Sequence, residues 1–148
     1  MGVLINVKIA GMNEALNAMK LRQINARNVD KLAIQRVALL LRDTMVRFAG
    51  AGHPEHPNVQ TGRLKSSIRY TLEEGTPAKA KVGSDAPYAP FVEFGHMQTP
   101  GRFVPDLGKR LVASFVKPYP FVRPAITQVF DGGQALTLVK NTVKEAIA

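Results

Sequence analysis

The residues best equipped for metal chemistry stand together in a short polar stretch, where His53 and His56 flank Glu55. Imidazole and carboxylate groups hold zinc in proteins, but two histidines on one segment bind it jointly when that segment is helical. Pro54 and Pro57 prevent a helix here. A zinc site also needs three or four converging ligands, and no further cluster lies nearby in the sequence. The stretch is therefore interpreted as a surface loop, and no metal site is expected.

The residue pattern does not indicate acid–base, nucleophilic or cofactor-dependent catalysis either. Glu73 and Glu74 are adjacent in an extended segment and would point to opposite faces, so they cannot act as an acid–base pair. Ser66 and Ser67 have no evident base beside them. The sequence contains no nucleophile elbow, no phosphate-binding loop and no dinucleotide-binding glycine motif. We expect a protein that is not an enzyme and that needs no cofactor.

The charge of the chain indicates what kind of partner it has. Twenty Lys and Arg against eleven Asp and Glu leave a net charge of +9. Such an excess indicates an acidic partner, either nucleic acid or an acidic protein surface, although a basic balance can also serve solubility alone. The absence of cysteine excludes disulfides and thiolate chemistry and fits assembly in a reducing cytoplasm. No apolar stretch approaches the roughly 20 residues that cross a bilayer, so no membrane partner is expected.

The elements that must position any functional residue predict one α+β domain over residues 1–148. Alternating apolar residues predict a strand from Val3 to Ile9. Helical periodicity predicts a long helix from Asn28 to Phe48, with Asn28 as its N-cap. Its apolar arc is wide, so it lies deep in the domain or packs against a second subunit. The core-facing stripe comprises Ala33, Val37, Leu40, Leu41, Thr44, Met45 and Phe48.

The second half of the chain completes the predicted architecture. A β-hairpin is expected from Leu64 to Val82, and a helix opened by Pro124 continues to the C-terminus with an interruption at Gly132-Gly133. A further strand is an option near Phe103. The predicted fold is a small, mostly antiparallel sheet with the long helix and the C-terminal helix packed on one face.

Two basic segments are candidate interfaces. The outward face of the hairpin is expected to gather Lys65, Arg69, Lys79 and Lys81, which would contact something acidic or form an ordinary solvated sheet face. Residues 96–117 mix loop signals with positive charge and apolar groups, which suits an extended arm that docks onto a neighbour; packing into the chain's own core is the alternative. The candidate contact residues of this segment are Arg102, Phe103, Lys109 and Arg110.

A short turn between these segments carries a distinct pattern. Tyr88, Phe91 and Val92 share one helical face, Pro90 suits a first helical turn, and Gly95 is expected to end the turn in the left-handed conformation. The apolar side chains expected to pack into the core are Tyr88, Phe91, Val92 and Phe94. Glu93 lies beside this stripe, either as a solvated glutamate or as an anchor for a backbone N–H or an arginine.

Three blocks in this order resemble the small neck component of long-tailed, lambdoid-type bacteriophages, the family of tail-completion or head–tail joining proteins, also called minor tail components. The blocks are residues 61–68 (TGRLKSSI), 88–95 (YAPFVEFG) and 120–125 (PFVRPA). Residues 96–117 are longer than the corresponding connection in shorter relatives. The residues that carry the resemblance are Thr61, Gly62, Leu64, Tyr88, Glu93, Phe94, Gly95, Phe121, Arg123 and Pro124.

The resemblance implies a structural virion protein in the neck or tail, assembled in the host bacterial cytoplasm. It would form a homo-oligomeric ring, expected to be a hexamer, at the head–tail interface. The implied partners are a head connector or stopper protein, a tail tube or tail terminator protein, and genomic DNA passing through the lumen. The alternative function is a basic module that binds DNA phosphates without sequence specificity, although helix-turn-helix and base-stacking signatures are missing from the sequence.

Overall fold

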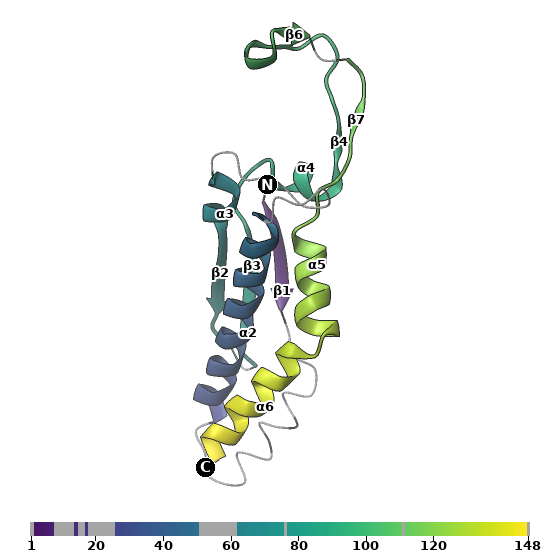
Figure 1. Cartoon of the computed structure of the whole chain (residues 1–148). Helices are drawn as coiled ribbons and strands as arrows, with labels where there is room; N and C mark the ends of the chain where they lie inside the picture. Colours follow the sequence, from purple (N-terminus) through teal and green to yellow (C-terminus); the bar gives the residue numbers. More distant parts are fainter. Residues whose placement is uncertain are drawn as a thin grey trace.

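The computed structural model of the chain describes residues 2–7, 14, 17, 26–50, 62–75, 77–110 and 112–147. Figure 1 shows two parts: a body of helices beside a small sheet, and a narrow arm that extends away from one end of it. The fold is α+β with antiparallel strands, as the sequence predicted. The predicted loop at residues 51–60, with its histidines, lies outside the described residues, as does Thr61.

The central sheet has three antiparallel strands in the order β1-β3-β2: β1 is Val3–Val7, β2 is Ile68–Glu73 and β3 is Lys79–Ser84. Its register places Ile5 and Tyr70 on either side of Val82, so these three side chains share one face. Val82 is fully buried there, while Leu4 on the opposite face is exposed. The predicted alternation of the first strand is thus confirmed for the residues that the structure describes.

Helix α2, Ala26–Phe48, lies against the sheet and contributes more buried apolar residues to the core than any other described element. Ala33, Val37, Leu41 and Met45 are fully buried, which confirms the predicted core-facing stripe. The helix begins two residues earlier than predicted, so Asn28 lies within its first turn and is not the N-cap.

The C-terminal half of the body is helical and packs on α2. Helix α5, Val122–Ile126, continues into a single π-helical turn, η2, Thr127–Asp131, and then into helix α6, Gln134–Ile147. The predicted break at Gly132-Gly133 is present, and Gly133 takes a positive φ of 72° there. Arg36 of α2 binds α6 by donating to Thr142 Oγ1 at 3.0 Å and to Glu145 Oε2 at 2.7 Å.

The predicted start of the hairpin at Leu64 is wrong. Residues Arg63–Ser67 form a short helix, α3, and the strand begins at Ile68. The hydroxyls of Ser66 and Ser67 each donate to the backbone carbonyl three residues earlier, which stabilises a helical turn in place of an extended strand. Lys65 consequently lies on a helix and does not belong to the face of the hairpin.

The arm consists of two short antiparallel ribbons. Its stem pairs β4, His96–Met97, with β7, Phe115–Val116. Its tip pairs β5, Phe103–Val104, with β6, Lys109–Arg110, around a 3-10 turn, η1, Pro105–Leu107. A strand near Phe103 therefore exists, but it pairs within the arm and not with the central sheet. Helix α4, Ala89–Phe94, lies at the base of the arm (Figure 1).

Candidate assembly interface

The base of the arm is closed by a buried carboxylate. Glu93 is 1 % exposed, and its Oε2 accepts the backbone N–H groups of Phe121 at 2.8 Å and Val122 at 2.9 Å. Its Oε1 accepts the N–H of Arg123 at 3.1 Å and lies 3.8 Å from the guanidinium Nε of the same residue. These N–H groups open helix α5 and have no partner within it, so a carboxylate from a distant segment caps the helix. Glu93 thus anchors backbone N–H groups, the more specific of its two predicted roles.

Two further contacts join the strands where the arm leaves the body. The backbone N–H of Tyr119 donates to the carbonyl oxygen of Val92 at 2.8 Å. A Cβ added to Gly95 would lie 2.5 Å from the carbonyl oxygen of Val116, so only glycine fits this close approach. Gly95 has φ 75° and ψ 173°, a positive φ as predicted but an extended ψ, so it does not take the left-handed helical conformation. We call this set of contacts, residues 92–95 with 116–123, the clasp.

Helix α4 buries a different face from the predicted one. Ala89 and Glu93 are buried, and Tyr88 and Val92 pack partly against the core. Phe91 and Phe94 are more than half exposed, so their predicted burial is wrong. The reason is that the clasp turns Glu93 inward together with Ala89, one helical turn earlier, which leaves Phe91 and Phe94 on the outward side of the helix. Arg123 covers the exposed ring of Phe94, with the guanidinium carbon 4.9 Å from the ring centroid.

The stem of the arm exposes large apolar side chains. Met97 and Phe115 are cross-strand partners, so they lie side by side on one face of the ribbon, and they are 63 % and 60 % exposed. Phe103 and Val112 are also more than half exposed. No described residue between Phe94 and Phe121 is buried. Exposed apolar groups gathered on one projecting element mark an interaction surface.

The tip of the arm is basic. Arg102, Lys109 and Arg110 are exposed, and they form no ion pair within the part of the chain that the structure describes. Arg110 donates one hydrogen bond to the carbonyl oxygen of Gly101 at 2.8 Å and is the cross-strand partner of Phe103. Asp106 in the turn is the one carboxylate among residues 96–117. The four candidate contact residues of this segment therefore lie together at the tip.

The basic residues of the hairpin have partners in the chain. Lys81 forms an ion pair with Glu73, and Arg69 lies 3.7 Å from Asp85. The pairing with Lys81 holds the pKa of the Glu73 carboxyl below its ordinary value. Arg69, Lys79 and Lys81 do share the outward face of the sheet, but two of the three are already balanced there. The hairpin is thus a weaker candidate for an acidic partner than the tip of the arm.

A comparison with protein families matches residues 14–95 to the family described as "Bacteriophage HK97-gp10, putative tail-component". The matched residues make up more than half of the chain. The chain belongs to this family. It is a structural component of a bacteriophage tail, and it resides in the virion. No curated protein and no solved structure matches it.

The matched range of this tail component differs from the blocks that carried the resemblance. It includes residues 61–68 and 88–95 but ends at Gly95, and it extends far into the first half of the chain. The block at residues 120–125 lies outside the match, yet the Glu93 carboxylate binds it directly. The arm also lies outside the match. It is inserted between two segments that the clasp holds together.

One residue of the tail component that the sequence analysis missed is Asp30. This carboxylate is buried in the stripe of α2, and its Oδ2 accepts the backbone N–H of Ala78. Burial raises the pKa of the Asp30 carboxyl, although the bond from Ala78 acts in the opposite direction. The sequence did contain a signal for its burial, because Asp30 lies one helical turn before Ala33 and Ile34 and therefore on the same apolar face of the helix.

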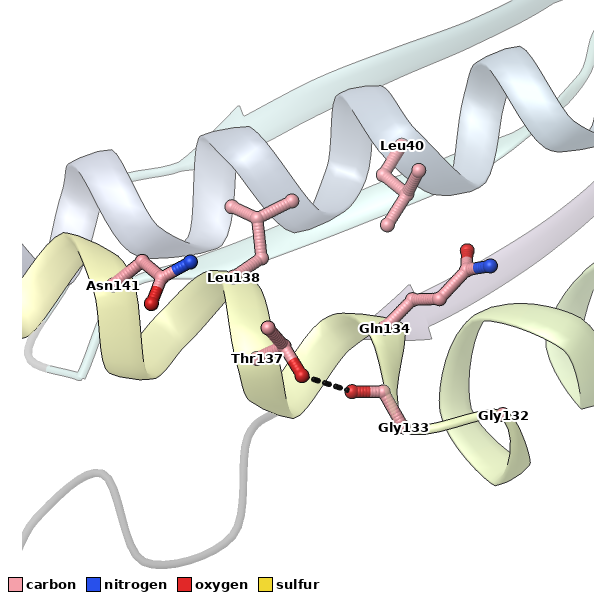
Figure 2. A pocket seen from close by; sticks show the side chains of 7 residues that line it. All are labelled: Leu40, Gly132, Gly133, Gln134, Thr137, Leu138 and Asn141. Atoms are coloured by element: carbon pink, nitrogen blue, oxygen red, sulfur yellow. Dashed lines mark hydrogen bonds between the residues drawn. The ribbon is translucent and has the colours of Figure 1, made fainter.

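A hollow in the described part of the tail component lacks acidic and basic side chains. An open hollow of about 350 Å³ lies between α2 and α6. Figure 2 shows that its lining combines leucines, glycines and neutral polar side chains, with Thr137 donating to the carbonyl oxygen of Gly133 at 3.0 Å. No acid or base is among the lining residues, which are Leu40, Gly132, Gly133, Gln134, Thr137, Leu138 and Asn141. No group of three potential metal ligands occurs among the described residues, and no described helix has the length and apolar character to span a membrane.

Proposed function

We propose that this tail component forms a homo-oligomeric ring at the head–tail interface, where it completes the tail and joins it to the head connector. The observation that carries the proposal is the arm, which projects from the body and buries none of its own described residues. An isolated two-stranded ribbon is at best marginally stable in water. An arm of this kind is best accounted for by a neighbour that covers its apolar stem.

The clasp supports the proposal because it determines where the arm points. A buried carboxylate with three N–H donors joins α4 to α5 at the point where the chain leaves the body. The stem is therefore attached to a firm base and not to a flexible linker. In a ring, an arm held at a fixed angle reaches the same point on each neighbouring subunit or on the adjacent ring.

The open face of the central sheet suits a channel wall. Its cations Arg69, Lys79 and Lys81 are opposed by Glu73 and Asp85, which leaves that region close to neutral. A channel that releases DNA quickly is best served by a wall with few unbalanced cations, because each phosphate contact adds to a salt-sensitive grip. We place this face toward the lumen and the unbalanced charge of the arm toward protein.

Electron microscopy of particles made without this chain tests the proposal. The phage whose genome encodes the chain should then produce filled heads and separate tails, and class averages of the purified protein should show closed rings whose subunits can be counted. Normal joined virions in the absence of the chain would overturn the proposed role. A monomer at all concentrations, combined with a steeply salt-dependent affinity for arbitrary duplex DNA, would favour the nucleic-acid-binding alternative.

A further inference from the structure

Most of the carboxylates that the structure describes in the body are engaged within the chain. Four carboxylates of the body each take part in an ion pair with a basic residue of the body: Asp43 with Arg42, Glu73 with Lys81, Asp85 with Arg69, and Glu145 with Arg36. Asp30 and Glu93 are buried and bind backbone N–H groups. Glu14, Glu74 and Asp131 are exposed without ion pairs among the described residues, but they lie on separate segments of the chain.

The tip of the arm gathers cations within a short stretch. Within residues 102–110, three exposed cations stand beside a single carboxylate, and none of the three is ion-paired within the described part of the chain. A second copy of this chain would offer the tip a surface of net charge +9 whose carboxylates are mostly engaged. Docking of the tip on a second copy would therefore bring like charges together, which is unfavourable.

The tip also differs from a surface built for DNA. Asp106 lies among the three cations, and its carboxylate opposes contact with the phosphate backbone of DNA. The cross-strand pair of Phe103 and Arg110 presents an exposed ring beside a guanidinium. The aromatic ring of Phe103 and the aliphatic side chain of Val112 would bind more favourably in an apolar pocket than against a phosphate group. Arginine and aromatic residues together are typical of the energetic centre of protein–protein interfaces.

We infer that the tip of the arm docks onto an acidic, partly apolar surface of a virion protein other than this chain. Arg102, Lys109 and Arg110 would pair with carboxylates of that protein while Phe103 enters an apolar pocket between them. The stem, with its Met97 and Phe115 face, remains available to a neighbouring copy. This inference rests on the proposed function, since it assigns the tip to the junction between the ring and the component next to it.

Carboxyl-to-amine cross-linking in purified virions identifies the partner directly. A zero-length carbodiimide reagent joins a lysine amine only to a carboxylate in direct contact. Lys109 should be recovered cross-linked to an Asp or Glu of a different virion protein, whereas Lys140 on the exposed face of α6 should not. A cross-link from Lys109 to a carboxylate of another copy of this chain would overturn the inference, as would the absence of any cross-link from Lys109.

A matched pair of triple variants gives an independent test. Arg102→Gln, Lys109→Gln and Arg110→Gln remove three cations from the tip. The control Lys31→Gln, Lys140→Gln and Lys144→Gln removes three exposed cations from the body with the same change in net charge. In a phage that lacks the natural gene, the tip variant should lower the infectious titre by about a hundredfold or more, because several interface ion pairs are lost together. The control should leave the titre within about threefold.

Equal titres for the two variants would overturn the inference and leave the proposed function intact, provided that phage without the chain still fails to join heads to tails. A fluorescein-labelled duplex DNA that binds the natural protein and not the tip variant would also overturn it, in favour of a DNA contact. Joined, infectious virions without the chain would instead refute the proposed function itself. The two failures are thereby distinguished.

Discussion

The body and the arm of this tail component use the same kinds of side chain in opposite ways. In the body, Phe121 is fully buried and Glu93 lies beside it with all its hydrogen bonds made to backbone. In the arm, Phe103 and Phe115 are more than half exposed, and the cations around them face solvent. The comparison shows that the body is ordered by burial, whereas the arm is supported by the clasp at its base and presents its side chains outward. Mutations should therefore affect folding in one region and assembly in the other.

The largest effect on stability is expected for Glu93→Ala. The change leaves the buried N–H groups of Phe121 and Val122 without an acceptor and removes the charge that stabilises the start of α5. We expect the free energy of unfolding to fall by about 3 kcal/mol or more, measured by urea denaturation. Glu74→Ala removes an exposed carboxylate of the same kind and should change stability by less than about 0.5 kcal/mol. Equal midpoints for these two variants would show that the clasp is dispensable.

A smaller but clear loss is expected for Gly95→Val. Its Cβ would lie 2.5 Å from the Val116 carbonyl oxygen and 2.7 Å from the Phe115 ring, at a φ that branched residues avoid. We expect a loss of more than about 1 kcal/mol in the free energy of unfolding. Gly101→Val is the matched control, because Gly101 also has a positive φ but open space around it in the arm. An unchanged denaturation midpoint for the Gly95 variant would refute the tight contact between the two segments.

The long helix and the hairpin could be predicted from the sequence because periodicity reports burial, and both elements belong to the body. The boundaries were less accurate: serine hydroxyls that bond to carbonyls three residues back extended a helical turn over the predicted strand at Leu64. The burial of Phe91 and Phe94 was predicted wrongly because hydrophobicity alone does not show that Glu93 takes the inner position. The pairing of Glu93 with residues 121–123 joins segments nearly thirty residues apart, which no local pattern reveals.

A pH-dependent effect of moderate size is expected at Asp30. Burial raises the pKa of its carboxyl above the ordinary value of 3.8, so the folded state binds a proton more tightly than the unfolded state. Its contribution to stability is fully present below pH 3.8 and is lost as pH rises through the raised folded pKa. Asp30→Asn keeps an oxygen to accept the N–H of Ala78 and removes the titration. The stability of this variant relative to the natural protein should therefore increase as pH rises from about 3.8 through that pKa.

Denaturation curves recorded from acidic to neutral pH measure this effect. The arm provides the matched control, since Asp106→Asn replaces an exposed carboxylate at the tip. Because Asp106 is exposed, this variant shows how much the exchange of a carboxyl for an amide outside the core changes the denaturation curves. A constant difference between Asp30→Asn and the natural protein across the pH range would mean that the raised pKa of Asp30 does not contribute to stability.

The smallest effect on stability, and the sharpest contrast with Glu93→Ala, is expected when the arm is shortened. Replacing residues 99–113 by Asn-Gly would join Gln98 to Ser114, which already face each other through a backbone hydrogen bond of 2.9 Å, in a tight hairpin. The clasp and the Met97–Phe115 pair are retained. Because no described residue in the removed stretch is buried, the free energy of unfolding should change by less than about 0.5 kcal/mol, and the circular dichroism spectrum should keep its helical signal. The same variant should fail to join tails to heads in a phage lacking the natural gene. A loss of stability as large as that of Gly95→Val would mean that the tip packs on its own body. The assignment of folding to the body and of assembly to the arm would then be wrong.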